Sequence, residues 1–261
     1  MKENVLQLKN VTWRRENTTL LSKVNWTIQK HEHWALLGLN GSGKTTLLNI
    51  INGYIWPTEG TIEVLGAQFG KTSLPELRKS IGWVSSSLQE KIPKLQYAQD
   101  VVISGKYASI GLYERVDEED ITKALDLMEK LDCSKLINRH YETCSQGERQ
   151  KLLIARALMS EPKLLILDEP CNGLDIFARE NILETIQQLA EDPEGPTLIY
   201  VTHHPEEILP VFNHTLLLRK GNVFMQGNTE EILSEKHLTA FFEHPVSVNW
   251  YGERASFQLV R

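Results

Sequence analysis

A glycine-rich octapeptide near the start of the chain has the composition of a phosphate-binding loop. It reads GLNGSGKT (Gly38–Thr45) and follows a short apolar run, Trp34–Leu37. Glycines let a backbone curl so that several N–H groups converge on phosphate oxygens, at the positive end of the following helix. Lys44 adds a positive charge near the β- and γ-phosphates, and the Thr45 hydroxyl can ligate Mg²⁺. The sequence therefore predicts a nucleotide site that uses Mg²⁺. The predicted contacts of the loop are Gly38, Asn40, Gly41, Ser42, Gly43, Lys44, Thr45 and Thr46.

Polar side chains follow two other apolar runs, where buried strands are expected to end. Asp168 and Glu169 follow Leu164–Leu167, and His203 closes the run TLIYVT (Thr197–Thr202). Ligands of α/β sheets collect at the carboxyl ends of the strands. Asp168 is predicted to hold Mg²⁺ together with Thr45, and a histidine at the second position can hydrogen-bond a γ-phosphate and the attacking water.

The segment CSQGERQ (Cys144–Gln150) predicts the start of a helix. Ser145 and Glu148 have the spacing of a capping box, and LLIARAL supplies the helix that follows. The N-terminus of that helix offers backbone N–H groups that lack partners within the helix.

The elements around these residues alternate between strands and helices. Strand-like patterns cover residues 5–11, 24–28, 57–66 and 197–201, and a hairpin is predicted at Thr215–Gly227, turning at Lys220–Asn222. Helices are predicted from Thr46 to Ile51 and over residues 182–189. Residues 117–132 carry an apolar helical face formed by Ile121, Ala124, Leu125, Met128 and Leu131. The strand–helix–strand order implies a parallel sheet.

Bulk composition narrows the class of protein. The chain has 261 residues, 41% of them hydrophobic and 24% charged, as in an ordinary globular protein, with ample core for one large domain. The net charge of −6 disfavours a nucleic-acid partner. No apolar run approaches the roughly 20 residues that span a bilayer, so a membrane role requires a partner. The three cysteines lack metal-type spacing and are expected to be reduced thiols of a cytoplasmic protein.

Taken together, GLNGSGKT, CSQGERQ, KLLIARAL and LLILDEP resemble the nucleotide-binding subunit of ABC transporters, along nearly the whole chain. The resemblance implies an α/β fold: a P-loop NTPase core with a parallel sheet, an N-terminal antiparallel β subdomain and an inserted helical subdomain. We expect a single nucleotide-binding domain over residues 1–261, with the helical subdomain at roughly 90–160 and no role assigned to the tail at 244–261.

The resemblance also assigns functions to individual residues. Glu169 corresponds to the general base that polarises the attacking water, and His203 to the family's switch histidine. Ser145, Gly147 and Glu148 correspond to the helix start that binds the γ-phosphate of ATP held by a second subunit. Asp175, in the stretch NGLD, corresponds to the loop through which the two subunits communicate. The implied active species is a head-to-tail dimer of this chain or of a related ATPase chain.

Several positions depart from the family pattern. Gln146 stands where glycine is usual and Cys144 where leucine is usual, so a side chain at Gln146 could weaken closure of the dimer. The glutamine expected after IGWVS is Ser86, and Gln89 is its candidate substitute.

The adenine-stacking aromatic falls near Arg15. Alternation along a strand places Trp13 and Arg15 on one side, so either could stack on the base, and Trp13 could equally be a sheet-packing residue.

The resemblance predicts an ATP-hydrolysing subunit docked on a membrane permease at the cytoplasmic face. DVVISGKY (Asp100–Tyr107) and INRHYETCSQGERQ resemble metal and metal-chelate importers. The serine run 85–87 and SIGLY (Ser109–Tyr113) resemble a molybdate-type subgroup. Two alternatives remain open: a permease-free ABC ATPase acting on a protein or regulatory complex, and a regulatory module that binds ATP but barely hydrolyses it.

Overall fold

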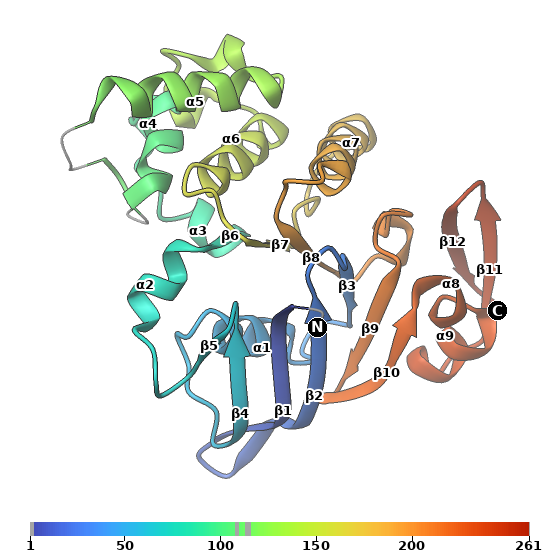
Figure 1. The fold of residues 1–261 in the computed structure, drawn as a ribbon. Coiled ribbons are helices and arrows are strands. Elements are labelled where there is room, and N and C mark those ends of the chain that lie inside the picture. Colours follow the sequence, from blue (N-terminus) through green and yellow to red (C-terminus); the bar gives the residue numbers. More distant parts are fainter. Residues whose placement is uncertain (1–2, 108–109, 113–115, 261) are drawn as a thin grey trace. The chain divides into compact units, whose positions relative to one another are not determined.

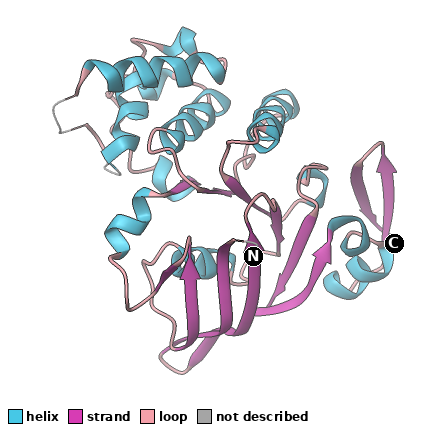
Figure 2. Cartoon of the chain, viewed as in Figure 1, coloured by secondary structure: helices cyan, strands magenta, loops and turns pink. Residues whose placement is uncertain are grey.

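The computed structural model describes residues 3–107, 110–112 and 116–260. The chain divides into two compact units, one formed by residues 1–77 and 197–261 and the other by residues 78–196. Figure 2 shows that strands dominate the first unit and helices the second. The short helix α2 (Leu74–Lys79) crosses the boundary between them in sequence.

The first unit contains a four-stranded antiparallel sheet, four further strands and a C-terminal hairpin, labelled in Figure 1. Its antiparallel sheet has the order β2-β1-β4-β5, and the strands β10-β9-β3-β8 lie side by side in that order. The bounds of the antiparallel sheet are β1 (Asn4–Arg15), β2 (Thr18–Gln29), β4 (Glu59–Val64) and β5 (Ala67–Gln68). Those of the other four strands are β3 (Trp34–Leu37), β8 (Thr197–Thr202), β9 (His214–Arg219) and β10 (Asn222–Asn228). The helices are α1 (Lys44–Ile51), α8 (Thr229–Ile232) and α9 (Glu235–Phe242), and a 3-10 turn, η4, covers Pro205–Glu207.

Residue patterning accounts for these strands. β3 and β8 are buried at every position, as expected of strands covered on both faces, and they pair in parallel. β9 also runs parallel to β3, which confirms the predicted parallel arrangement. The predicted hairpin is β9–β10, whose turn uses positive φ angles at Lys220 (49°) and Gly221 (77°). In the core, the Trp26 and Trp34 rings pack edge to face with centroids 5.7 Å apart.

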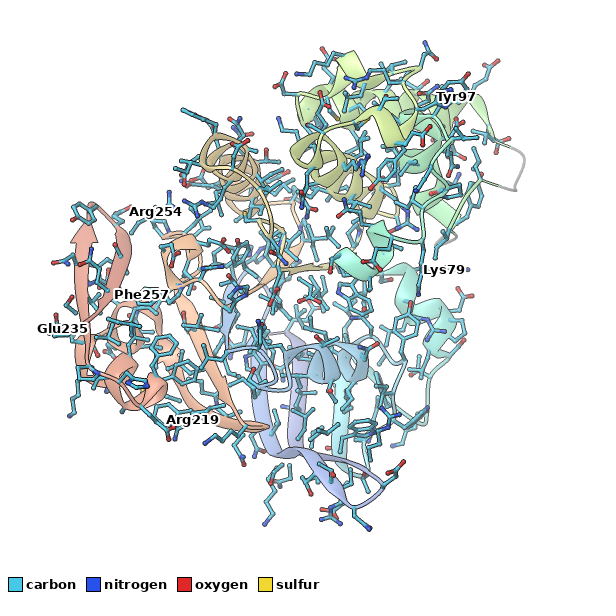
Figure 3. The ribbon with its side chains drawn as sticks, turned by 180° about the vertical axis from the view of Figure 1, so that it is seen from behind. Lys79, Tyr97, Arg219, Glu235, Arg254 and Phe257 are labelled. Carbon is cyan, nitrogen blue, oxygen red and sulfur yellow. The ribbon has the colours of Figure 1, made fainter. Side chains whose placement is uncertain are left out.

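The C-terminal tail, to which we assigned no role from the sequence, forms a regular element. β11 (Val246–Tyr251) and β12 (Arg254–Leu259) form an antiparallel hairpin. Its turn places Gly252 at φ 61°. Phe257 of β12 stacks on Phe242 of α9 with ring centroids 5.7 Å apart, and Arg254 Nη2 donates to the Glu206 carbonyl at 2.9 Å. Figure 3 labels Phe257 and Arg254. The tail is therefore packed against the rest of the first unit.

The second unit consists of helices around a parallel strand pair, β6 (Ile81–Ser85) and β7 (Leu164–Asp168). Its helices are α3 (Ser86–Gln89), α4 (Ala98–Ile103), α5 (Glu118–Lys130), α6 (Gln146–Leu158) and α7 (Ile176–Glu191). Short 3-10 turns cover Ser104–Tyr107 (η1), Ser134–Leu136 (η2) and Tyr141–Thr143 (η3). Gly105 of η1 approaches α6 so closely that a Cβ there would lie 1.9 Å from the Arg156 carbonyl oxygen, so only glycine fits.

The prediction of an apolar face on α5 is wrong at one position. Ala124, Met128 and Leu131 are buried as expected, but the Ile121 side chain is 42% exposed. Its neighbour Asp120 is buried instead. The Asp120 carboxylate accepts hydrogen bonds from Lys106 Nζ at 2.5 Å and from the Tyr107 hydroxyl at 3.0 Å. The hydrogen bond from Lys106 lowers the pKa of Asp120 below its usual value, although burial opposes this shift. At this end of α5 the buried side chain is therefore Asp120, in an ion pair with Lys106, and not Ile121.

The three cysteines are buried and carry free thiols. Burial raises the pKa of Cys133 to about 11 and raises that of Cys144 above its ordinary value.

Candidate nucleotide site

The predicted phosphate loop joins β3 to α1 in the first unit. Gly41 and Gly43 have φ angles of 77° and 106°, in the region that residues with a Cβ rarely adopt. Close contacts add a second constraint. A Cβ at Gly43 would lie 2.9 Å from Leu21 Cδ2, and one at Gly38 would lie 2.5 Å from Ser42 Oγ. The loop therefore has no space for side chains at Gly38 and Gly43.

The Lys44 ammonium folds back over this loop. Lys44 is only 7% exposed, and its Nζ donates to the Gly38 carbonyl at 2.7 Å and lies 3.5 Å from that of Leu39. α1 begins at Lys44, and the first turn contains no acidic residue. A buried cation beside the uncapped N–H groups of a helix start is an environment that fits phosphate groups. The residues present thus fit a nucleotide.

The side chains around the loop differ in exposure. Asn40, Gly41 and Thr45 are exposed, Thr46 is half-buried and Ser42 is buried. Thr45 is exposed, as its predicted role as a Mg²⁺ ligand requires.

A glycine of the β9–β10 turn supports the loop, and sequence reasoning did not single it out. The Gly221 N–H donates to the Ser42 carbonyl at 2.8 Å, and the Gly221 carbonyl accepts from the Ser22 N–H at 2.9 Å. A Cβ at Gly221 would lie 2.3 Å from the Leu20 carbonyl oxygen. The only sequence signal was its place in a predicted hairpin turn.

The proposed adenine contacts lie near the end of β1. Trp13 is half-buried and Arg15 is exposed. The pairing of β1 with β2 shifts register between Trp13 and Arg14, so the regular alternation assumed for Trp13 and Arg15 is interrupted there. Which of the two contacts adenine stays a prediction.

His203 follows β8 directly, as the sequence predicted. The segment after it is fixed by Glu207, a buried carboxylate of η4 that accepts hydrogen bonds from Tyr200 (2.9 Å) and Thr202 (2.7 Å). Thr202 Oγ1 also accepts from the His204 N–H at 2.9 Å. These contacts define the path of the chain on both sides of His203. Sequence reasoning missed Glu207, because a glutamate beyond a strand end reads as a solvated residue.

Asp168 and Glu169 belong to the second unit. Asp168 is the last residue of β7 and pairs with Ser85 of β6. Glu169 adopts φ 51°, and its carbonyl accepts from the Asn172 N–H at 3.1 Å, which forms a tight turn. Left-handed backbone is uncommon for a residue with a side chain and is found at functional sites.

The serine run after β6 forms the start of α3. Ser85 Oγ accepts from the Leu88 N–H at 3.4 Å and lies 3.1 Å from Ser87 Oγ. Ser86 is exposed and Gln89, the last residue of α3, is half-buried. Which of them replaces the family's glutamine stays a prediction.

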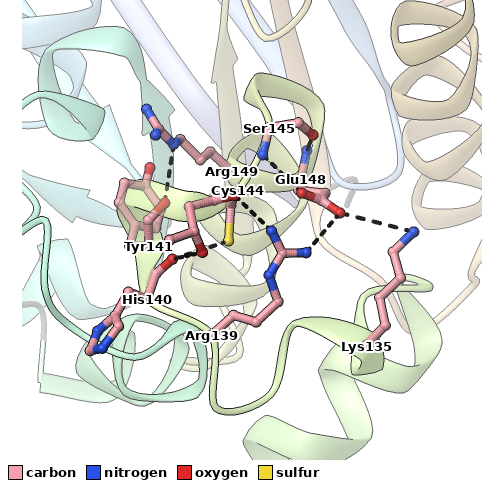
Figure 4. Close-up of polar contacts among 9 residues, drawn as sticks. Lys135, Arg139, His140, Tyr141, Cys144, Ser145, Glu148 and Arg149 are labelled. Carbon is pink, nitrogen blue, oxygen red and sulfur yellow. Dashed lines mark hydrogen bonds and ion pairs between the residues drawn. The ribbon is translucent and has the colours of Figure 1, made fainter.

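The predicted capping box at the start of α6 is present. Ser145 Oγ accepts from the Glu148 N–H at 3.3 Å, and the Glu148 carboxylate accepts from the Ser145 N–H at 2.8 Å. Figure 4 shows Lys135 and Arg139 directed at the same carboxylate, with N–O distances of 4.0 and 3.4 Å. Partial burial alone would raise the pKa of Glu148, but the Ser145 N–H and the Arg139 charge lower it below its usual value.

A second arginine fixes the chain that leads into α6. Arg149 donates to the carbonyls of Tyr141 (3.2 Å) and Glu142 (2.6 Å), and the Cys144 thiol is directed at the His140 carbonyl at 3.6 Å. Cys144 is buried. Thus Cys144, where the family usually has leucine, fills a core position.

Asp175, the predicted communication residue, is the N-cap of α7. Its Oδ1 accepts from the Ala178 N–H at 2.9 Å. A Cβ at Gly147 would lie 3.2 Å from Ala178 Cβ, so the starts of α6 and α7 pack closely. The structure brings Ser145, Gly147, Glu148, Asp168, Glu169 and Asp175 into the second unit, whereas the phosphate loop, Trp13, Arg15 and His203 belong to the first.

Comparison with known proteins decides the family. The sequence pattern of the ABC transporter family matches residues 21–172. The chain belongs to the ABC transporter family. It is 49% identical over 251 residues to the ABC transporter ATP-binding protein YlmA of Bacillus subtilis, covering 96% of this chain and 95% of that protein. It is 34% identical to the molybdate import ATP-binding protein MolC of Haemophilus influenzae, covering 87% and 83% of the two chains.

A solved structure of a metal-chelate type ABC transporter, in an inward-facing conformation, is 30% identical. It superposes with a TM-score of 0.81 over 99% of this chain and 98% of that one. The predicted fold class and the predicted function, an ATP-binding and Mg²⁺-dependent ATP-hydrolysing subunit of an ABC transporter, are confirmed. In residues 3–107, 110–112 and 116–260, no helix has the length and apolar character needed to span a membrane.

Proposed function

We propose that this ABC ATPase energises an importer of a metal, a metal chelate or an oxyanion. It acts at the cytoplasmic face of the membrane, bound to a separate permease. The similarity to MolC and to the metal-chelate type transporter supports this class of cargo. The resemblance of the stretch Asp100–Tyr107 to the corresponding stretches of metal and metal-chelate importers supports it too. In the molybdate-like stretch SIGLY, Ser109 and Tyr113 lie outside the described residues.

The site residues have separate roles in ATP hydrolysis. The phosphate loop binds the phosphates through its N–H groups and Lys44, which stabilises charge that develops on the transferred group. Glu169 accepts a proton from the attacking water, and His203 hydrogen-bonds the γ-phosphate. Thr45 and Asp168 hold Mg²⁺, which supplies Lewis-acid stabilisation of the phosphates when bound. The buried Lys44 ammonium over a glycine loop is the observation that carries this assignment.

The start of α6 completes the site of a second subunit. Its N–H groups, held by the capping box of Ser145 and Glu148, face the γ-phosphate bound by the partner ATPase chain, with Gly147 allowing close approach. Asp175 contacts the partner at the same interface. Two ATP molecules are thus enclosed in a head-to-tail dimer, whose closing and reopening drive the permease.

A single substitution tests both the chemistry and the partner. Glu169→Gln is expected to bind ATP while hydrolysing it at least about 100-fold more slowly, because it lacks the general base. The matched control is Glu184→Gln, at an exposed position of α7. Hydrolysis by Glu169→Gln near the wild-type rate would remove Glu169 from this role.

The same variant identifies the partner. Glu169→Gln, tagged and recovered from detergent-solubilised cells with ATP, is expected to retain a multi-spanning membrane protein in stoichiometric amount. Recovery of only the ATPase chain or of non-membrane proteins would instead establish the permease-free ATPase. This permease-free ATPase is the second candidate function. It is favoured by the serine-capped start of α3, where the family's coupling glutamine is replaced.

A further inference from the structure

The side chain of Gln146 reaches from the start of α6 to the segment that follows β7. Its Nε2 donates to the Asn172 carbonyl at 2.8 Å. The same nitrogen lies where a side chain at residue 173 would have to go, since a Cβ at Gly173 would be 2.7 Å from it. Gly173 has φ 72°, so this position requires glycine for its conformation as well. Gln146 therefore contacts two consecutive residues of the same turn.

The turn held by Gln146 is the one that begins at Glu169. The Asn172 N–H donates to the Glu169 carbonyl at 3.1 Å, so Asn172 joins Gln146 on one side to Glu169 on the other. Glu169 is in left-handed backbone, φ 51°, a conformation that persists only where neighbouring contacts impose it. The hydrogen bond from Gln146 holds Asn172, the residue at the other end of this turn.

The two elements that Gln146 joins are each firmly placed. The start of α6 is fixed by its capping box and the start of α7 by Asp175, and Gly147 packs against Ala178 between them. A side chain anchored on a fixed helix start can restrain the turn that it contacts. Gln146 is itself exposed, so its contact is a local link and not part of the core.

We propose that Gln146 is a positioning residue for Glu169. It links, within one chain, the helix start that faces one ATP to the glutamate that acts on the other ATP. This inference rests on the head-to-tail dimer of the proposed function. In that dimer, one chain contributes its α6 start to the partner's nucleotide and its Glu169 to its own. Gln146 thereby couples the two nucleotide sites, instead of weakening closure of the dimer as a side chain at this position would be expected to do.

Homodimers carrying Gln146→Met or Gln146→Glu test the contact. Both side chains match glutamine in length and lack its N–H donor, so kcat is expected to fall about three- to ten-fold, the equivalent of one lost hydrogen bond. The dissociation constant for ATP, measured without hydrolysis, is expected to change less than two-fold. Gln188→Glu, on an exposed position of α7, is the control. Unchanged kcat in both variants, or a loss confined to ATP affinity, would overturn the proposal.

Mixed dimers show through which site Gln146 acts. One subunit carries Glu169→Gln, so hydrolysis depends on Glu169 of the other subunit. Gln146→Met is then added to either subunit. If Gln146 acts through Glu169 of its own chain, Gln146→Met lowers the rate of ATP hydrolysis most when it lies in the subunit that retains Glu169. The loss of rate is then expected to be about five-fold greater than when Gln146→Met lies in the other subunit. A larger loss in the opposite placement, or equal losses, would show that Gln146 acts on the partner's nucleotide.

The two proposals fail in different ways. A wild-type chain that neither dimerises with ATP nor hydrolyses it would overturn the proposed function. A wild-type chain that does both, with no difference between the two placements, would overturn only the role of Gln146.

Discussion

The phosphate loop and the start of α6, the two segments that we propose to bind phosphate through backbone N–H groups, are held in place by different means. In the loop, Gly41 and Gly43 have positive φ, and close contacts leave no space for side chains at Gly38 and Gly43. At the start of α6, side chains do the holding: Ser145 and Glu148 cap the helix, and Arg139 pairs with Glu148. A loop built on glycines tolerates few substitutions, whereas the start of α6 accommodates the side chain of Gln146.

The strongest test of this contrast is Lys44→Ala. The substitution removes a buried ammonium from the loop, and we expect ATP hydrolysis to fall at least about 100-fold because charge on the transferred phosphate is no longer stabilised. Steady-state ATPase assays and nucleotide titration measure the effect. Lys9→Ala, at an exposed position of β1, controls for loss of a lysine. Activity within a few-fold of wild type would show that the loop does not depend on its lysine.

Gly43→Ala addresses the steric part of the contrast. We expect it to lower the free energy of unfolding by about 1–3 kcal/mol, since alanine is strained at φ 106° and its Cβ meets Leu21. Gly70→Ala is the matched control, because Gly70 also has positive φ (89°) but a Cβ there meets nothing within 4 Å. Chemical denaturation of both variants separates strain from clash. Equal losses would mean that the contact with Leu21 contributes nothing.

The smallest effect concerns the capping carboxylate of α6. The folded-state pKa of Glu148 is lowered, so its contribution to stability is present above the unfolded value near pH 4.3 and is lost as pH falls through the folded value. Glu148→Gln is expected to cost about 1 kcal/mol at pH 7 and less at pH 3.5. Urea denaturation at the two pH values checks this, with the exposed Glu129→Gln as control. A cost that is the same at both pH values would contradict the assignment.

The same contrast explains what the sequence could predict. The phosphate loop and β3 follow from local patterns of glycine and apolar residues, and the capping box follows from a spacing of three residues. Asp120 was not predictable, because its burial depends on Lys106, which lies 14 positions earlier. Side-chain pairing between segments is invisible to periodicity.

The C-terminal hairpin was missed for another reason. Val246, Val248 and Trp250 alternate along β11, and Gly252 marks the turn, so the signal was present but short. The pairing of Arg254 with the Glu206 carbonyl, which joins the hairpin to the segment after His203, depends on tertiary structure alone. The roles of Glu169, His203 and Asp175 rest on family resemblance and stay predictions.

The buried cysteines of the second unit can report when its fold opens locally. A thiol with a pKa of about 11, as at Cys133, is almost entirely protonated at neutral pH. While it is buried, alkylating reagents cannot reach it. Alkylation of Cys133 then requires the local fold to open. The rate of alkylation, measured with and without ATP, would report how often the fold around Cys133 opens, and no engineered probe is needed.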